Sequence, residues 1–200
     1  MDRKGGNSYS YGGGSRGDEG AGLPAPVGRE FLALQQLKGH PNIVSLLDVY
    51  PGEFEVVLVF DLLPSDLEIV IREARAPLHP SLIKGYMDML LRALQHCHCH
   101  GVLHRDIKPA NCLLSTSGLL QLGDFGLARP FSAPQRSPMS HQVATRWYRA
   151  PELLFGARWY DDGVDTWGAG VIFAELLSLA PLFPGHSDID QLFRVLQILG

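Results

Sequence analysis

The chain has 200 residues, of which 46% are hydrophobic, enough for about one ordinary domain with a buried core. Its formal net charge of −4 gives no reason to expect a nucleic acid or an anionic membrane as a partner. Three cysteines are too few for a disulfide framework, and no apolar run is long enough to span a membrane. We therefore expect a soluble intracellular protein of the cytoplasm, the nucleus or both.

The first 22 residues are rich in glycine, serine and arginine and almost free of apolar side chains. Such a composition cannot offset the entropy of ordering the chain, so we predict that residues 1–22 are disordered. Gly12, Gly14 and Gly17 match the spacing of a phosphate-covering glycine loop. Because no strand-like run flanks them, we interpret this match as a low-complexity coincidence.

A helix and two strands are predicted next. Residues 24–37 have helical spacing, with three apolar side chains on one face: Phe31, Leu34 and Leu37. Strand-like runs follow at residues 43–50 and 54–60. The second run is fully apolar from Val56, which predicts a strand buried on both faces.

Two longer helices are predicted further along the chain. Residues 80–99 carry an apolar stripe at helical spacing, formed by Leu82, Tyr86, Leu90, Leu91 and Leu94. This helix runs into alternating histidines and cysteines at residues 96–100, whose spacing is poor for zinc, so we interpret them as a helix end. Residues 164–179 are apolar nearly all round, which predicts a helix buried in the centre of the protein.

Residues 104–126 have the composition of a phosphoryl-transfer site. Moving a γ-phosphoryl group to a hydroxyl needs positioning and charge neutralisation more than covalent help. Asp106 is the candidate base, and Lys108 can neutralise charge on the γ-phosphate. Asn111 and Asp124 offer the oxygen ligands that Mg²⁺ prefers. Between them a polar turn separates two short apolar runs, which predicts a hairpin over residues 112–122 that holds both metal ligands at one edge.

The order and spacing of these motifs resemble those of the eukaryotic protein kinases. His104-Arg105-Asp106 is followed by Asn111, then by Asp124-Phe125-Gly126, and then by Ala150-Pro151-Glu152. Residues 141–154 and 182–185 are similar to the cyclin-dependent-kinase-like group, in particular to the cell-cycle-related kinases. The resemblance implies a serine/threonine kinase that uses ATP and Mg²⁺.

The resemblance also implies an α+β bilobal fold. Residues 23–63 would be the remnant of the small lobe and the hinge, and residues 64–200 a mostly helical large lobe without its last helices. The first strands of the small lobe, with their glycine loop and ATP-binding lysine, find no match, because no lysine lies between Gly17 and Glu30. We therefore expect a truncated kinase domain.

Individual roles follow from the same resemblance. Phe60, Asp61 and Leu63 match the hinge that pairs with adenine, Leu113 matches the floor of the adenine pocket, and Asp66 matches the aspartate that contacts ribose. Glu30 matches the glutamate of the lysine–glutamate ion pair, and Thr145 matches the residue that contacts the catalytic aspartate. By resemblance Asp165 would also brace the backbone of the catalytic loop, residues 104–111. Its position is equally that of a simple helix N-cap, and the two roles are compatible.

The resemblance further implies regulation and substrate choice. Arg29, Arg105 and Arg129 match the arginines that grip a phosphorylated activation-loop residue, and the matching acceptor is Ser140. Val143 and Arg149 match residues that shape a pocket for proline after the acceptor residue. Expected partners are protein substrates, a cyclin or cyclin-like activator, and an upstream activating kinase. Two function classes stay open: an active kinase, and a kinase-like module that docks partners without turnover.

Overall fold

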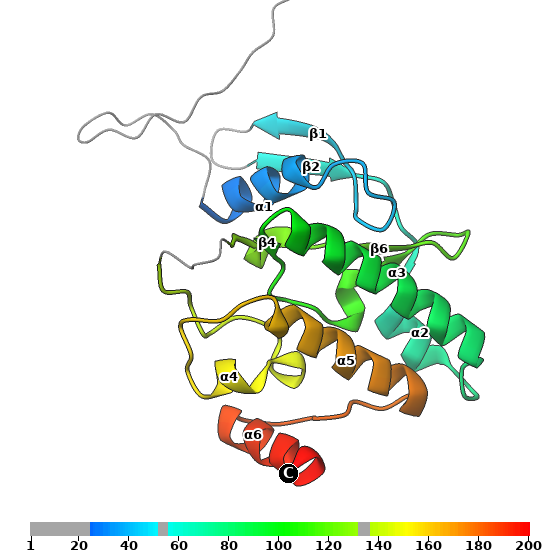
Figure 1. The fold of residues 1–200 in the computed structure, drawn as a ribbon. Coiled ribbons are helices and arrows are strands. Elements are labelled where there is room, and N and C mark those ends of the chain that lie inside the picture. Colours follow the sequence, from blue (N-terminus) through cyan, green and yellow to red (C-terminus); the bar gives the residue numbers. More distant parts are fainter. Residues whose placement is uncertain (1–24, 52–55, 132–136) are drawn as a thin grey trace, which may run out of the picture.

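The computed structural model describes residues 25–51, 56–131 and 137–200. A small unit of one helix and two strands lies above a larger, mostly helical unit (Figure 1). The predicted disorder of residues 1–22 and the glycine pattern within them lie outside the described residues.

The small unit confirms the predicted helix and both strands. Helix α1 (Ala25–Gln36) packs against an antiparallel pair formed by β1 (Leu46–Pro51) and β2 (Val56–Phe60). The prediction that β2 is buried on both faces is wrong, because Val57 is 48% exposed and the rest of the strand is half-buried. In the described part of the chain β2 pairs only with β1, and Val57 forms a solvent-facing cross-strand pair with Tyr50.

Two helices cross the larger unit side by side, α3 (Pro80–Cys99) and α5 (Gly163–Ser178) (Figure 1). Helix α3 has the predicted bounds and buries Tyr86, Leu90 and Leu94. Leu82 and Leu91 are exposed, contrary to prediction, because each lies one residue from the buried stripe and thus on its flank. Helix α5 is only partly central, since Phe173 and Leu177 are exposed.

Short strands position the loops of the site. Cys112–Leu114 (β5) and Leu120–Leu122 (β6) form the predicted hairpin, which Ser65–Asp66 (β3) extends to three strands in the order β3-β5-β6. Val102–Leu103 (β4) pairs with Arg129–Pro130 (β7). The remaining helical elements are α2 (Leu67–Glu73), η1 (Pro109–Asn111), η2 (Phe125–Leu127), η3 (Arg146–Tyr148), α4 (Pro151–Leu154) and α6 (Asp188–Leu199).

The small and large units are joined through the hairpin. The Asn42 side chain donates a hydrogen bond to the Leu120 carbonyl at 2.8 Å, and Val44 N donates to the Leu122 carbonyl at 3.0 Å. A main hydrophobic core runs through both units, and a smaller one packs Leu103 against apolar side chains of residues 139–164. Among the helices of the described residues, none combines the length and apolar character needed to cross a membrane.

Candidate active site

Asp106 is the centre of a converging set of hydrogen bonds. Its Oδ1 accepts from the backbone N of Thr145 at 2.9 Å and from the Thr145 hydroxyl at 3.0 Å. Its Oδ2 accepts from Lys108 Nζ at 2.8 Å and from Asn111 Nδ2 at 3.2 Å. Lys108 Nζ also donates to Thr145 Oγ1 at 3.2 Å. The structure thus brings together all four residues predicted to be catalytic.

The electrostatics of this set keep Asp106 ionised. Burial by itself would raise the pKa of Asp106, but the hydrogen bonds from Lys108 and Thr145 outweigh burial and hold the pKa below its ordinary value. Asp106 is therefore a carboxylate at neutral pH, and it can accept a proton from a hydroxyl brought beside it.

The backbone of the catalytic loop is held from below by Asp165, which is almost fully buried. Asp165 Oδ2 accepts from His104 N at 2.9 Å, and Oδ1 accepts from Arg105 N at 2.7 Å. His98 shares a further hydrogen bond with Asp165 at 3.0 Å. This is the predicted bracing contact. The interpretation as an N-cap is wrong, because Asp162 occupies the cap position and Asp165 lies inside the first turn of α5.

The two predicted metal ligands flank the hairpin at its open end, as predicted, because Cys112 pairs with Leu122 and Gly123 N donates to the Asn111 carbonyl at 2.9 Å. The Nδ2 of Asn111 donates a hydrogen bond to the Asp106 carbonyl at 2.8 Å. The amide group of Asn111 therefore faces Asp106 with its donor, and the Asn111 Oδ1 is left to act as an acceptor. Asp124 is exposed, and its Oδ1 accepts from Gly126 N at 3.3 Å. Two oxygen donors of this kind fit Mg²⁺, which usually takes one or two protein ligands together with substrate phosphates.

Glu30 reaches this edge of the site from α1. Burial raises the pKa of Glu30, and the nearby negative charge of Asp124 raises it further. In the described ranges no lysine, arginine or histidine forms an ion pair with Glu30. Glu30 thus lies beside Asp124, and the described residues supply no cation to pair with it, so its predicted ion pair stays a prediction.

The predicted nucleotide-binding residues lie at the end of β2, in the segment that follows it, and in strands β3 and β5. Phe60 ends β2, and it is followed by exposed Asp61 and half-buried Leu63. The Leu113 side chain packs so closely over Gly123 that a Cβ there would lie 3.0 Å from it. Asp66 Oδ1 accepts from Ile69 N at 2.9 Å and caps α2. The described contact of Asp66 is thus structural, and its ribose contact stays a prediction.

The predicted phosphate-binding arginines have separate contacts. Arg105 is buried, donating to the Leu127 carbonyl at 2.8 Å and to the Tyr160 hydroxyl at 3.1 Å. Tyr160 in turn donates to the Ser140 carbonyl at 2.6 Å. Arg129 contacts the Ser137 hydroxyl at 2.9 Å, and Arg29 is exposed on α1. Ser140 itself is exposed, and its backbone is linked to Arg105 through Tyr160, a residue that the sequence reasoning missed.

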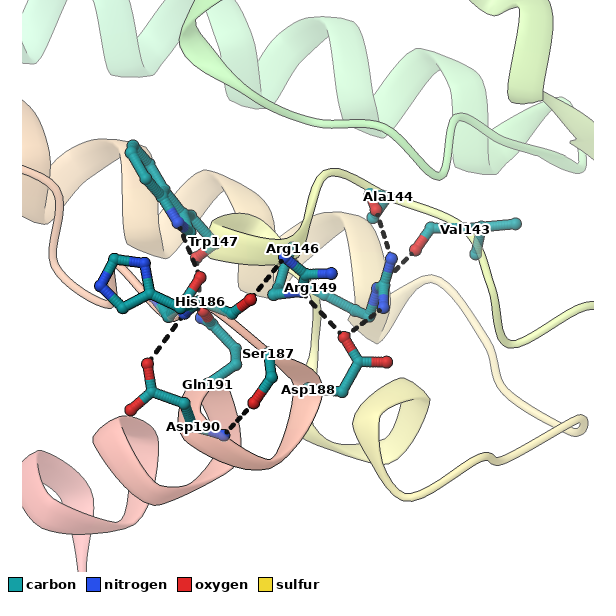
Figure 2. Close-up of polar contacts among 11 residues, drawn as sticks. Val143, Ala144, Arg146, Trp147, Arg149, His186, Ser187, Asp188, Asp190 and Gln191 are labelled. Atoms are coloured by element: carbon teal, nitrogen blue, oxygen red, sulfur yellow. Dashed lines mark hydrogen bonds and ion pairs between the residues drawn. The ribbon is translucent and has the colours of Figure 1, made fainter.

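The predicted substrate pocket is organised by Arg149 (Figure 2). Its Nε donates to the Val143 carbonyl at 2.9 Å, and its Nη2 donates to the Ala144 carbonyl at 3.0 Å. Ala144 has a left-handed backbone with φ of 63°. Arg149 therefore occupies the carbonyls of two successive residues, and both predicted pocket residues take part.

Sequence reasoning missed two residues of α6 that support this pocket. Asp188 accepts from Arg149 Nη1 at 3.1 Å, and buried Gln191 donates to the Trp147 carbonyl at 3.3 Å. A polar residue at a helix start is ordinarily interpreted as a cap or a solvated side chain. Only the tertiary fold, which brings α6 beside residues 143–149, gives these two residues their role.

A family model described as a protein kinase domain matches residues 17–199 of the chain. Cyclin-dependent kinase 20 of Danio rerio is 53% identical over 179 residues, which cover 90% of this chain and 52% of that protein. Cyclin-dependent kinase 7 of Xenopus laevis is 49% identical over 187 residues, which cover 94% and 53%, respectively. The chain thus spans about half the length of the curated relatives it matches.

A solved structure is similar to this one over most of the chain. A chain in the CAK complex of Chaetomium thermophilum bound to ATP-γ-S is 42% identical, with a TM-score of 0.81. The match covers 92% of this chain and 58% of that one. The similarity of the two structures at 42% sequence identity confirms the expected α+β kinase fold.

Proposed function

Because the chain belongs to the protein kinase family, in its cyclin-dependent-kinase-like group, we propose that the protein transfers the γ-phosphate of ATP to serine or threonine hydroxyls of other proteins. The observation that carries this proposal is the arrangement around Asp106, whose carboxylate meets Lys108, Asn111 and Thr145. A non-catalytic binding module is not favoured, because such a module would have no need of this arrangement.

In the proposed reaction Asp106 accepts the proton of the acceptor hydroxyl, and Thr145 holds the carboxylate in place. Lys108 places a positive charge beside Asp106 and Thr145. This charge would stabilise the negative charge that develops on the γ-phosphate during transfer. Asn111 and Asp124 would hold Mg²⁺, which neutralises phosphate charge when it is bound. Asp165 keeps the loop backbone in the required shape.

We also propose a preference for serine or threonine followed by proline, with tyrosine disfavoured. The carbonyls of Val143 and Ala144 already accept from Arg149, so they are poor acceptors for the backbone N–H of the residue after the substrate hydroxyl. Leaving a buried donor unpaired costs about 1–3 kcal/mol. Proline has no N–H and avoids this cost.

The test is a phosphate-transfer assay on the longest native form of the protein, with a peptide library, radiolabelled ATP and Mg²⁺. We expect incorporation at serine and threonine before proline, and a loss of at least about a hundredfold in Asp106→Asn. Incorporation that survives this substitution would refute the assigned base. An active enzyme without a preference for proline would refute the substrate proposal alone.

We propose that phosphorylation of Ser140 by an upstream kinase activates the protein, and that a cyclin-like partner binds it inside the cell. The support for the first part is an exposed hydroxyl in a loop whose backbone is tied to Arg105 through Tyr160. A phosphate there can form charge-assisted hydrogen bonds with arginine. The relatives named as cyclin-dependent kinases support the second part.

The regulatory proposal predicts that Ser140→Ala lowers the activity of the native protein, whereas Ser137→Ala in the same loop lowers it less. Phosphate mapping of the active protein is expected to find Ser140 modified. Equal activity of the two variants, with Ser140 unmodified in active protein, would overturn the proposal.

A further inference from the structure

The guanidinium of Arg149 is engaged on two sides. One edge faces the Val143 and Ala144 carbonyls, and Nη1 faces Asp188 Oδ1 at 3.1 Å (Figure 2). The side chain is only 14% exposed, and an arginine stays charged at any working pH. A charge this far buried needs a counter-charge, and Asp188 supplies it.

The backbone of Asp188 is placed by contacts that do not depend on the charge of its side chain. It is the first residue of α6, where the helix N-terminus favours an anion. The Gln191 side chain accepts from Gly185 N at 3.0 Å and donates to the Trp147 carbonyl at 3.3 Å. Trp147 Nε1 donates to the Gly185 carbonyl at 3.1 Å. These neutral hydrogen bonds fix the start of α6 against residues 146–149 (Figure 2).

Asp188 Oδ1 also accepts from Arg146 Nε at 3.0 Å, and Arg146 Nη1 donates to the His186 carbonyl at 3.2 Å. One carboxylate oxygen therefore lies between two guanidinium groups. Because the guanidinium is planar and its donors point in fixed directions, a partner on Nη1 restricts how the opposite edge is oriented.

We propose that Asp188 is a positioning residue for the site that receives the residue after the substrate hydroxyl. It holds Arg149 in the orientation that occupies the Val143 and Ala144 carbonyls, so that a substrate N–H finds no acceptor there. This inference rests on the proposed preference for proline, and it names an α6 residue as a determinant of that preference. Without Asp188, Arg149 is free to turn toward solvent, and the Ala144 carbonyl becomes available.

The proposal predicts that removing Asp188 tightens the binding of one peptide as well as reducing the preference for proline. Three peptides are compared that differ only after the acceptor serine, with proline, alanine or N-methylalanine at that position. N-methylalanine lacks an N–H but does not have the proline ring, so it separates the missing donor from the shape of the ring. The unaltered protein is expected to bind the proline and N-methylalanine peptides about tenfold more tightly than the alanine peptide.

In Asp188→Ala the alanine peptide is expected to bind more tightly than it binds the unaltered protein, so that the tenfold difference falls to about threefold or less. Asp188→Glu is expected to retain part of the discrimination. The matched control is Asp190→Asn, which also removes a negative charge from the first turn of α6, but one whose contacts are to His186 N and Arg194. A variant that merely loosened the fold would weaken all three peptides together.

The measurement is an NMR titration of each peptide, which needs no phosphate transfer, on the longest native form of the protein. If the unaltered protein binds the proline and alanine peptides equally, the proposed preference itself fails, and if it binds the alanine and N-methylalanine peptides equally, the explanation by a missing N–H fails. If it discriminates between them and Asp188→Ala keeps the full difference, only the role of Asp188 is overturned. A change of the same size in Asp190→Asn would also overturn that role.

Discussion

Arg105, Asp124 and Ala144 each combine a side chain with a left-handed backbone, with φ of 68°, 56° and 63°. Such residues cost roughly 1–3 kcal/mol each and persist only where surrounding contacts hold them. For Arg105 the contact is the hydrogen bond from its own N to buried Asp165. The shape of the catalytic loop therefore depends on one carboxylate of α5.

Asp165→Asn should accordingly destabilise the protein strongly. The substitution replaces a carboxylate that accepts from His104 N and Arg105 N, and hydrogen bonds to charged groups contribute about 1.5–3 kcal/mol each. We expect a loss of about 3 kcal/mol in the free energy of unfolding, measured in urea. Asp162→Asn, at the exposed start of the same helix, is the control and should cost less than about 1 kcal/mol. Equal losses would contradict the bracing role.

Lys108 is expected to set the protonation of Asp106. Burial raises the pKa of this carboxyl and the Lys108 hydrogen bond is the largest opposing cause, so Lys108→Met should raise the pKa. Since the folded pKa lies below the ordinary value, Asp106 contributes stability at neutral pH that is lost as the pH falls below that value. The variant should lose part of this contribution. Carboxyl-detected NMR titration measures the shift, and Lys84→Met is the control. An unchanged Asp106 titration would reject the prediction.

Helix α5 packs closely against the catalytic loop at Gly168. A Cβ on this residue would lie 2.9 Å from Ile107 Cβ and 3.1 Å from the Ile107 carbonyl oxygen. Ile107 connects Asp106 to Lys108, so any shift of Ile107 moves the site. The glycine therefore permits the contact between α5 and the loop that carries the base.

This contact predicts opposite effects of the same substitution at two positions of α5. Gly168→Ala should destabilise the protein by about 1–3 kcal/mol through overpacking. Gly170→Ala meets nothing within 4 Å and should stabilise it by about 0.5–1 kcal/mol, because alanine favours the helix. Thermal unfolding of both variants decides the matter, and a stabilised Gly168→Ala would disprove the tight contact.

Local patterns were enough to predict α3, the hairpin and the grouping of Asp106, Lys108, Asn111 and Thr145, because each depends on short-range spacing or on a matched motif. Burial was predicted less well. Val57 and Leu177 are apolar yet exposed, since hydrophobic composition does not say which neighbours cover a side chain. Asp188 and Gln191 could not be found because their contacts join segments about 40 residues apart.

A stack of three histidines joins the small unit to the large one. His40, in the loop after α1, stacks on His96 of α3 with ring centroids 4.6 Å apart, and His96 lies 4.1 Å from His100. Burial lowers the pKa of His40 and of His96. His96 and Arg92 lower the pKa of His40 further, and His100 lowers that of His96. The cavity beside the stack is also lined by Cys99, and Gln36 of α1 donates to the His100 carbonyl. The stack therefore favours the uncharged form of the His40 and His96 rings.

Acid should loosen this connection. The unfolded histidines titrate near 6.5 and the folded ones lower, so the unfolded chain binds more protons and stability falls as the pH drops below about 7. His96→Phe keeps an aromatic ring but cannot be charged, so it should reduce the loss of stability between about pH 7 and pH 5. Urea unfolding at both pH values measures the loss, with His186→Phe as the control. An equal acid sensitivity of the two variants would contradict the prediction.

The last prediction concerns a polypeptide limited to residues 1–200, which we expect to transfer phosphate very poorly. Glu30 has no basic partner in the ranges that the structure describes, and no lysine occurs between Gly17 and Glu30. Each missing preorganised contact to developing charge removes about a hundredfold to a thousandfold in rate. Since kinases commonly turn over at about 1–100 per second, we expect a rate at least about a hundredfold lower.

Glu30→Gln separates this explanation from general misfolding. In the 200-residue polypeptide burial and the charge of Asp124 disfavour the Glu30 carboxylate, and the hydrogen bond from the Phe125 backbone is one that a glutamine oxygen can also accept. The substitution should therefore leave the low rate unchanged and should raise stability at neutral pH. In any longer native form that supplies a cation to Glu30, the same substitution should lower activity. A radiolabelled-phosphate assay with Asp106→Asn as the blank measures both forms. Turnover in the ordinary range by the 200-residue polypeptide, abolished in the blank, would show that residues 1–200 suffice for catalysis.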